Sequence, residues 1–231
     1  MTHDAAKDPL TTHFGSLKVT YDPRVLAPRP WTIAQSYWAS EAAAWAPPGP
    51  ILELHCGAGH IGLAAAHLSR RSLVQIDRDA VACELARLNA DHAGLGEETE
   101  VRLAAIPRGL LDAERFPVII ADPPYVPTSE VARHPDDPVG AIDGGRDGLD
   151  EVRCCVELAA RHLDEKGLFI LQLRTIEQAH EVAAMSPGLE VVGTRCIDDL
   201  GVLVGLQVDR SRRGLSRQVA RNTSTAMSST R

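Results

Sequence analysis

Short apolar runs alternate with segments of helical periodicity along most of this chain. From residue 51 onward aliphatic runs recur, and between them the apolar residues return every three or four positions. The runs predict strands over 51–55, 72–77, 100–106, 116–122, 167–173, 189–197 and 201–209. The periodic segments predict helices over 33–45, 61–70, 79–94, 148–163 and 175–185. Strands that are apolar at nearly every position are typical of a parallel sheet buried between helices.

The alternation of strand and helix predicts an α/β fold of the Rossmann-like type. Its sheet would have seven strands, mostly parallel and closed by an antiparallel strand, with helices on both faces. Residues 21–210 are expected to form one domain. Residues 1–20 are expected to be poorly ordered, and residues 211–231 to form a basic, disordered tail.

Composition places the chain among water-soluble globular proteins. Of its 231 residues 44% are hydrophobic, no apolar run reaches the length of a membrane helix, and the first residues lack the apolar stretch of a signal peptide. Five scattered cysteines show neither a CxxC pair nor a Cys/His spacing. We therefore expect a cytoplasmic protein with reduced thiols, no metal site and no membrane association.

Charge is distributed unevenly along the chain. The formal net charge is −7, yet six arginines and no acidic residue lie between Arg210 and Arg231, so the remainder carries about −13. Affinity for nucleic acid comes largely from neutralising phosphates. An acidic body therefore disfavours nucleic acid as a partner.

Residues that follow the predicted strands are candidates for ligand binding, because ligands of such sheets bind at the carboxyl ends of the strands. The candidates for binding a cofactor are Glu53, His55, Cys56, Gly57, Gly59, Asp77, Ile106 and Asp122. Gly57 and Gly59 permit a tight turn before a helix, and Asp77 can accept both hydroxyls of a ribose. A carboxylate at Glu53 would repel a pyrophosphate, which favours S-adenosylmethionine over a dinucleotide.

The segment Asp122-Pro123-Pro124-Tyr125 follows the apolar run at 118–121. The prolines remove two backbone donors, so the loop presents only acceptors, namely the Asp122 carboxylate and the carbonyls of Asp122 and Pro123. Such a loop suits a planar NH2 group, whose nitrogen becomes a better nucleophile when both hydrogens are accepted. Tyr125 can lie against that flat group and orient it. These four residues are the predicted catalytic residues, and no metal is needed.

A Gly-, Pro- and Asp-rich segment, 135–148, separates this loop from the next predicted helix. It is long for a plain connection, which suggests a lid over the substrate.

Several segments resemble class I S-adenosylmethionine-dependent methyltransferases and, more narrowly, the HemK/PrmC family of release factor glutamine methyltransferases. The resemblance covers about residues 22–210 and rests on "VLAPRPWT", "LELHCGAGHIGLAAA", "VQIDRDAVACELARLNA" with Asn89, "FPVIIADPPYVP" and "AIDGGRDGLDEVR". It implies that Gly57, Gly59 and Asp77 hold the cofactor, that residues 122–125 hold a glutamine amide, and that the partner is a protein such as a peptide chain release factor.

This sequence departs from the family pattern at several positions. Asp122 replaces the usual Asn, His55 replaces a glycine, and Ala105 and Ile106 stand where an acid usually reads the adenine. The family's N-terminal helical domain is not present in the sequence.

Two alternatives to glutamine methylation therefore remain open. The same chemistry could act on the exocyclic amino group of a nucleic-acid base or on a small molecule. Alternatively, the chain could bind S-adenosylmethionine without catalysis and serve as an interaction module; His55 and Ala105 favour this reading, and the intact loop at 122–125 opposes it.

Overall fold

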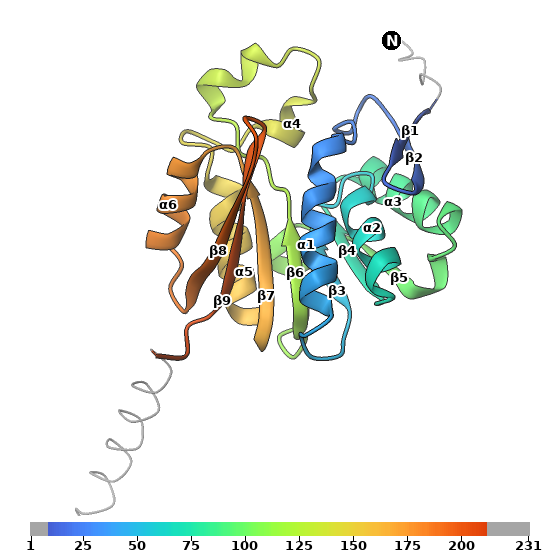
Figure 1. Ribbon diagram of the computed structural model, residues 1–231. Helices are drawn as coiled ribbons and strands as arrows, with labels where there is room; N and C mark the ends of the chain where they lie inside the picture. Colours follow the sequence, from blue (N-terminus) through green and yellow to red (C-terminus); the bar gives the residue numbers. More distant parts are fainter. Residues whose placement is uncertain (1–8, 212–231) are drawn as a thin grey trace, which may run out of the picture.

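The computed structural model describes residues 9–211. A seven-stranded sheet in the order β5-β4-β3-β6-β7-β9-β8 forms its centre (Figure 1). Its strands are β3 (Ile51–Leu54), β4 (Leu73–Asp77), β5 (Thr99–Leu103), β6 (Phe116–Ala121), β7 (Leu163–Leu173), β8 (Leu189–Ile197) and β9 (Gly201–Val208). The first five are parallel, while β9 is antiparallel to both β7 and β8. The predicted sheet, including its antiparallel closing strand, is confirmed.

Helices cover both faces of this sheet. One face packs against α1 (Ile33–Ala43), α2 (His60–Ser69) and α3 (Ala80–His92). The other packs against α5 (Asp150–His162) and α6 (Ile176–Ala184). Strands β3 and β6 are buried at every position, in keeping with their apolar sequences, which Glu53 alone interrupts with a charged side chain. Two hydrophobic cores therefore lie on either side of one buried sheet.

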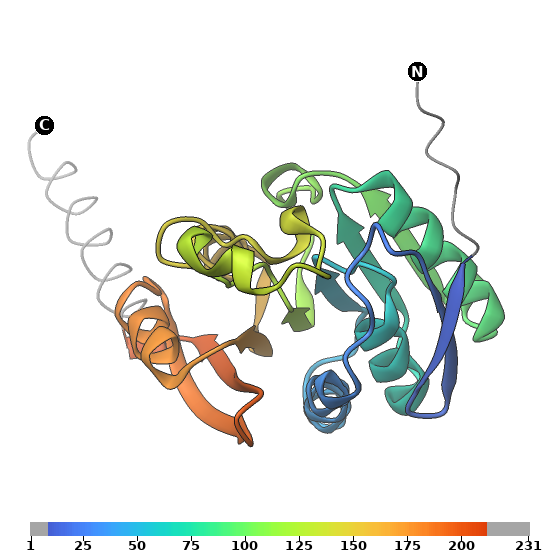
Figure 2. The same cartoon turned by 90° about the horizontal axis from the view of Figure 1, so that it is seen from above.

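A hairpin occupies much of the segment for which the sequence predicted disorder. Strands β1 (Leu10–Phe14) and β2 (Leu17–Tyr21) pair antiparallel and lie beside α2 and α3 (Figure 2). The expectation is wrong for residues 10–20, because Phe14 and Val19 are each only 1% exposed and belong to the core. Residues 1–8, like the tail beyond residue 211, lie outside the described residues.

Short helices connect the main elements. They are η1 (Pro30–Thr32), η2 (Gly96–Glu98), η3 (Ile106–Arg108), η4 (Thr128–Arg133) and α4 (Val139–Ile142). The strand predicted over 100–106 ends at Leu103. Strand β7 begins at Leu163, four residues before the predicted start of the strand at 167. We call residues 126–149, which include η4 and α4 and lie above the sheet in Figure 1, the cover segment.

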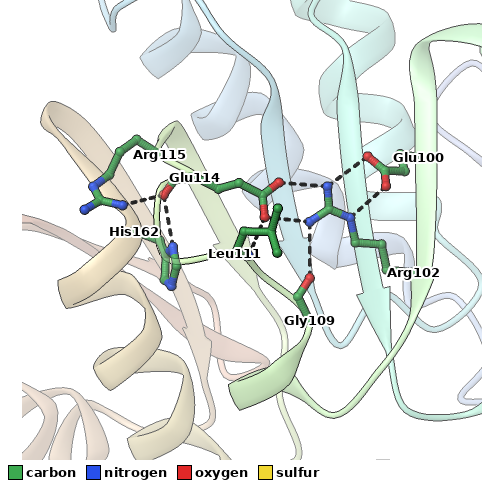
Figure 3. A network of polar contacts seen from close by, with 7 residues as sticks. All are labelled: Glu100, Arg102, Gly109, Leu111, Glu114, Arg115 and His162. Atoms are coloured by element: carbon green, nitrogen blue, oxygen red, sulfur yellow. Dashed lines mark hydrogen bonds and ion pairs between the residues drawn. The ribbon is translucent and has the colours of Figure 1, made fainter.

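An arginine on β5 fastens the connection from β5 to β6 (Figure 3). Arg102 donates hydrogen bonds of 2.8 to 3.1 Å to Glu100, Glu114 and the carbonyl of Gly109. The carbonyl of Glu114 lies 3.0 Å from His162 Nδ1 on α5. This network holds η3 and the following loop against the sheet.

Among the described residues, no helix is both long enough and apolar enough to cross a membrane.

Candidate active site

The glycine turn, residues 55–59 between β3 and α2, has three residues in left-handed backbone conformation. Their φ angles are 55° at His55, 53° at Gly57 and 79° at Gly59. A Cβ atom at Gly59 would lie 2.8 Å from Gln75 Nε2. Glycine is therefore required at 59 both by conformation and by space, whereas at 55 a histidine adopts a conformation that disfavours side chains.

Asp77 lies at the end of β4 with its carboxylate against this turn. Its Oδ2 accepts the backbone N–H of Gly57 at 2.9 Å, and its Oδ1 accepts that of Asp79 at 2.9 Å. The N-cap of α3 is Asp79, whose side chain accepts the N–H groups of Val81 and Ala82. Asp77 is thus not used as the helix cap. Burial raises the pKa of its carboxyl group, and each of its oxygens retains a lone pair for a further donor.

A cavity of about 340 Å³ opens above the glycine turn. Of the predicted cofactor residues it is lined by His55, Cys56, Gly57, Asp77 and Asp122. The sequence did not indicate the walls that come from residues 24–32, from Arg78 and Asp79 and from the start of α2, while residues 138–141 belong to the segment predicted to form a lid. This volume lies within the range of small-molecule sites.

Three of the predicted cofactor residues do not line this cavity. Glu53 is 2% exposed and accepts the N–H of Gly62 at 3.0 Å and Gln75 Nε2 at 2.5 Å. Gly59 faces Gln75 and Ala86, and Ile106 is a core residue beside α5. Burial raises the pKa of Glu53 to about 8, so this carboxyl group is mostly neutral at pH 7. A neutral Glu53 would not repel a pyrophosphate, so this part of the argument against a dinucleotide is not supported.

A second cavity, of about 290 Å³, is lined by all four predicted catalytic residues, Asp122 to Tyr125. Trp31, Arg29 and Arg174 contribute to the opposite walls. Asp122 and Arg29 line both cavities, so the Asp122 side chain stands where the two meet. Burial raises the pKa of Asp122 to about 7, although the nearby Arg29 opposes the shift.

Glycines of the cover segment lie directly on the backbone of the loop at residues 122–125. A Cβ at Gly144 would lie 2.7 Å from the carbonyl oxygen of Pro124, and one at Gly148 would clash with the carbonyl of Tyr125. That Tyr125 oxygen also accepts Gln178 Nε2 at 3.0 Å. The close approach explains why "GGRDG" follows the loop, since a larger residue at 144 or 148 would displace it.

Arginines hold the cover segment over the two cavities. Arg29 donates to both carboxylate oxygens of Asp137, at 2.5 and 2.7 Å, and Arg174 donates to Glu130 at 2.7 Å. Arg29 and Arg174 come from different ends of the chain. The prediction of a lid over the substrate thus has a structural counterpart, because residues of the cover segment form walls of both cavities.

The arrangement brings the carboxylates of Asp77 and Asp122 to the same edge of the sheet, on the two strands next to β3. Asp77 ends β4 and Asp122 follows β6, and these strands flank β3 on either side. At the usual strand spacing, β4 and β6 are separated by about 10 Å. This span suits a nucleoside whose ribose binds at Asp77 and whose reactive substituent reaches Asp122. Within residues 9–211 no cluster of His, Cys, Asp and Glu has the arrangement of a metal site.

Comparisons with known sequences agree with this arrangement. The family described as "Methyltransferase small domain" matches residues 42–134. The chain is 34% identical over 197 residues to the release factor glutamine methyltransferase of Pseudomonas aeruginosa, a match that covers 81% of this chain and 68% of that protein. To the enzyme of the same name from Gloeobacter violaceus it is 31% identical over 171 residues, covering 71% and 59%.

A third relative bears a different substrate in its name. The ribosomal protein uL3 glutamine methyltransferase of Burkholderia pseudomallei is 35% identical over 155 residues, covering 62% of this chain and 50% of that protein. The chain therefore spans less than two thirds of the Gloeobacter and Burkholderia relatives.

Solved structures share the fold. The ribosomal protein L11 methylase of Lactobacillus delbrueckii subsp. bulgaricus superposes with a TM-score of 0.60 at 14% identity, covering 82% of this chain and 84% of that one. The match, together with the strand order, confirms the class I methyltransferase fold.

Proposed function

Because the chain belongs to the release factor glutamine methyltransferase family, we propose that it transfers the methyl group of S-adenosylmethionine to the side-chain amide nitrogen of a protein glutamine. The observation that carries the proposal is the position of Asp122 on the wall shared by the two cavities. A methyl donor in the first cavity and an amide in the second would meet at this residue.

The residues of the first cavity fit the methyl donor. Asp77 offers an acceptor to the ribose hydroxyls, and the Gly57 N–H that it holds fixes the turn beneath them. Asp122 also lines this cavity, and its carboxylate would attract the positive charge of the sulfonium. When bound, S-adenosylmethionine supplies an electrophilic methyl group, so the protein has only to align the nucleophile.

The loop at 122–125 would activate the amide. The Asp122 carboxylate and the neighbouring backbone carbonyls accept the two N–H hydrogens, which draws the nitrogen lone pair out of conjugation. Residues 122–125 would thereby direct the nitrogen lone pair toward the methyl group that S-adenosylmethionine supplies. The methylated nitrogen releases a proton, and the ionised Asp122, with a pKa of about 7, is placed to accept it.

The substrate is proposed to be a protein that carries an exposed glutamine. Relatives are named for release factors and for ribosomal protein uL3. Both classes of protein work at the ribosome, which would place the activity in the cytoplasm. Trp31 and Tyr125 offer flat apolar surfaces in the second cavity, and these suit the side-chain amide and the backbone next to it.

The test is transfer of labelled methyl from S-adenosylmethionine to four separate pools: purified release factors, ribosomal protein uL3, total RNA and DNA, and small molecules from cell extract. We expect label on a glutamine of one of the two proteins, located by peptide mass spectrometry. Asp122→Ala should abolish the label, while Asp112→Ala, at an exposed site in the β5–β6 connection, should retain it.

Other outcomes would redirect the proposal. Label confined to nucleic acid or small molecules would refute glutamine as the acceptor and retain the N-methyltransferase chemistry. Cofactor binding without label in any pool would favour a non-catalytic binding module.

A further inference from the structure

A buried glutamine holds the start of the loop at residues 122–125. Gln35 on α1 is completely buried, and its Nε2 donates to the carbonyls of Ala121 at 2.9 Å and Ile170 at 3.0 Å. These two carbonyls belong to the neighbouring strands β6 and β7, and they cannot bind each other because both are acceptors. The side-chain NH2 supplies both donors, so Gln35 fixes the last carbonyl of β6, one residue before Asp122.

A second glutamine holds the other end of this loop. Gln178 on α6 donates from Nε2 to the carbonyl of Tyr125 at 3.0 Å, and its Oε1 accepts the backbone N–H of Arg174 at 3.0 Å. Both polar atoms of the side-chain amide are therefore used, which fixes its orientation. Since α1 and α6 cover opposite faces of the sheet, the loop is held from both faces.

The carbonyls between these two ends have no such partner. Within residues 9–211, the carbonyl oxygens of Asp122, Pro123 and Pro124 accept no hydrogen bond. Those of Asp122 and Pro123 belong to the acceptors that the proposed reaction needs for the two N–H hydrogens of the amide. The two glutamines thus occupy the outer carbonyls and leave the inner ones available.

Neither glutamine lines the first or the second cavity. A ligand bound in these cavities would therefore meet the loop and not the glutamine side chains. Any influence of the glutamines on the reaction must act through the position of the loop.

We propose that Gln35 and Gln178 are positioning residues for the methyl transfer, and that they hold both ends of the loop so that the carbonyls of Asp122 and Pro123 meet the acceptor amide in a fixed geometry. This inference rests on the proposed function, since it requires an acceptor nitrogen in the second cavity. Loss of either side-chain NH2 should disturb the alignment of the nitrogen with the methyl group and leave the binding of both ligands nearly intact.

A purely structural role gives a different expectation. Removing a donor from a buried carbonyl destabilises the fold, whether or not that carbonyl serves the reaction. Gln172 on β7 is a matched control, because it is also completely buried and donates from Nε2 to the carbonyl of Leu173 at 2.8 Å, outside the loop. A structural role predicts similar effects for all three glutamines, whereas positioning predicts a loss of turnover only for the two that hold the loop.

The test compares Gln35→Met, Gln178→Met and Gln172→Met, because methionine keeps the approximate size of glutamine without its NH2 group. The acceptor is the release factor or ribosomal protein uL3, whichever the wild-type protein labels. We expect kcat to fall about 10- to 100-fold in Gln35→Met and Gln178→Met, while KM for the acceptor and Kd for S-adenosylhomocysteine change less than about 3-fold. Gln172→Met should keep the wild-type kcat.

Circular dichroism at the assay temperature should show that each variant is folded. Gln178 is 8% exposed and so less deeply buried than Gln35, and Gln178→Met therefore provides the comparison with Gln172→Met if Gln35→Met does not fold.

Each outcome has a separate meaning. If the wild-type protein labels neither acceptor, the proposed function fails. If it is active and the folded loop variants keep its kcat, or if Gln172→Met loses as much turnover as they do, the inference is overturned while the proposed function stands. A loss confined to KM or Kd would also overturn it, because it would indicate a role in binding and not in alignment.

Discussion

The backbone N–H of Gly57 donates a 2.9 Å hydrogen bond to Oδ2 of Asp77, which joins the glycine turn to the end of the neighbouring strand. Two residues separated by twenty positions in the chain thereby form one rigid unit. The carboxylate shapes the turn and still has lone pairs directed into the first cavity. The floor of the cavity and the group that would bind ribose thus depend on the same side chain.

Asp77→Ala should therefore weaken binding of S-adenosylhomocysteine by about 10- to 100-fold, the cost of losing one or two hydrogen bonds to a charged acceptor. Isothermal titration calorimetry measures this. Asp77→Asn should lose less affinity than Asp77→Ala, since the amide oxygen can still accept one of the two backbone N–H groups that Asp77 binds, those of Gly57 and Asp79. Unchanged affinity in the alanine variant would move the ribose contact to another residue.

Asp122 should control turnover more than cofactor affinity. Asp122→Ala removes the acceptor at the meeting point of the two cavities, so kcat should fall by about 100- to 1000-fold while the Kd for S-adenosylhomocysteine changes only a few-fold. In the wild-type protein kcat should rise with pH through about 7, because the ionised form accepts hydrogen bonds and the proton. Asp122→Asn has no group at this position that titrates, so its kcat should lose the rise near pH 7. If the variant keeps this rise, the titration belongs to another group.

The raised pKa of Asp122 also makes a prediction about stability. Between about pH 4 and pH 7 the folded protein retains a proton that the unfolded chain has released, so this group stabilises the fold at low pH and loses that contribution as pH rises. Asp122→Asn should be more stable than wild type at pH 8, because the amide carries no charge into the buried site. The expected gain is about 1 to 3 kcal/mol, since water in the cavities screens part of the wild-type charge. The gain should vanish near pH 4. Denaturant unfolding at the two pH values measures the difference, which includes the easier ionisation of Glu53 once the Asp122 charge is removed.

Gly59→Ala should be more destabilising than Gly94→Ala. Both glycines have positive φ, 79° and 70°, but a Cβ at 59 would lie 2.8 Å from Gln75 Nε2 and 3.1 Å from Ala86 Cβ, while at 94 it would meet open space. Gly94→Ala should cost about 1 kcal/mol for backbone strain alone. Gly59→Ala should cost about 1–3 kcal/mol more for the crowding. Equal costs in urea unfolding would show that the turn adjusts to the added methyl group.

Asn89 should be needed for the stability of the hairpin. Its Oδ1 accepts the N–H of Thr20 at 2.7 Å, and its Nδ2 donates to the carbonyls of Thr20 and Ala58. Asn89→Ala leaves these buried backbone groups unpaired and should cost about 2–4 kcal/mol. Hydrogen exchange should then increase at residues 10–21 before the central sheet, and exchange that increases evenly over the protein would contradict a local role.

Asn89 also marks where sequence reasoning was limited. Asn89 belongs to the segment VQIDRDAVACELARLNA, which resembles the family, but its partner Thr20 lies in a segment that the sequence predicted to be poorly ordered. The strands at 10–14 and 17–21 have only five residues each, and although residues 17–21 alternate between apolar and polar side chains, so short a run is a weak signal. The packing of Phe14 and Val19 into the core with α2 and α3, together with the hydrogen bonds of Asn89 to Thr20, adds contacts that a five-residue pattern does not reveal.

The order of strands and helices, the loop at 122–125 and the placement of Asp77 were determined by the sequence itself. Uninterrupted apolar runs require burial on both faces, and parallel strands place their carboxyl ends at one edge, so the residues after them meet there. Such local regularities leave a readable pattern.

The tertiary structure alone decided which of those residues face a ligand. Glu53 and Gly59 follow the same local pattern as His55 and Gly57, yet they face the core: Glu53 is 2% exposed and Gly59 packs against Gln75 and Ala86. Arg29 and the cover segment reach the cavities from distant parts of the chain. Contacts of this kind depend on how elements pack in three dimensions, and no periodicity along the chain encodes them.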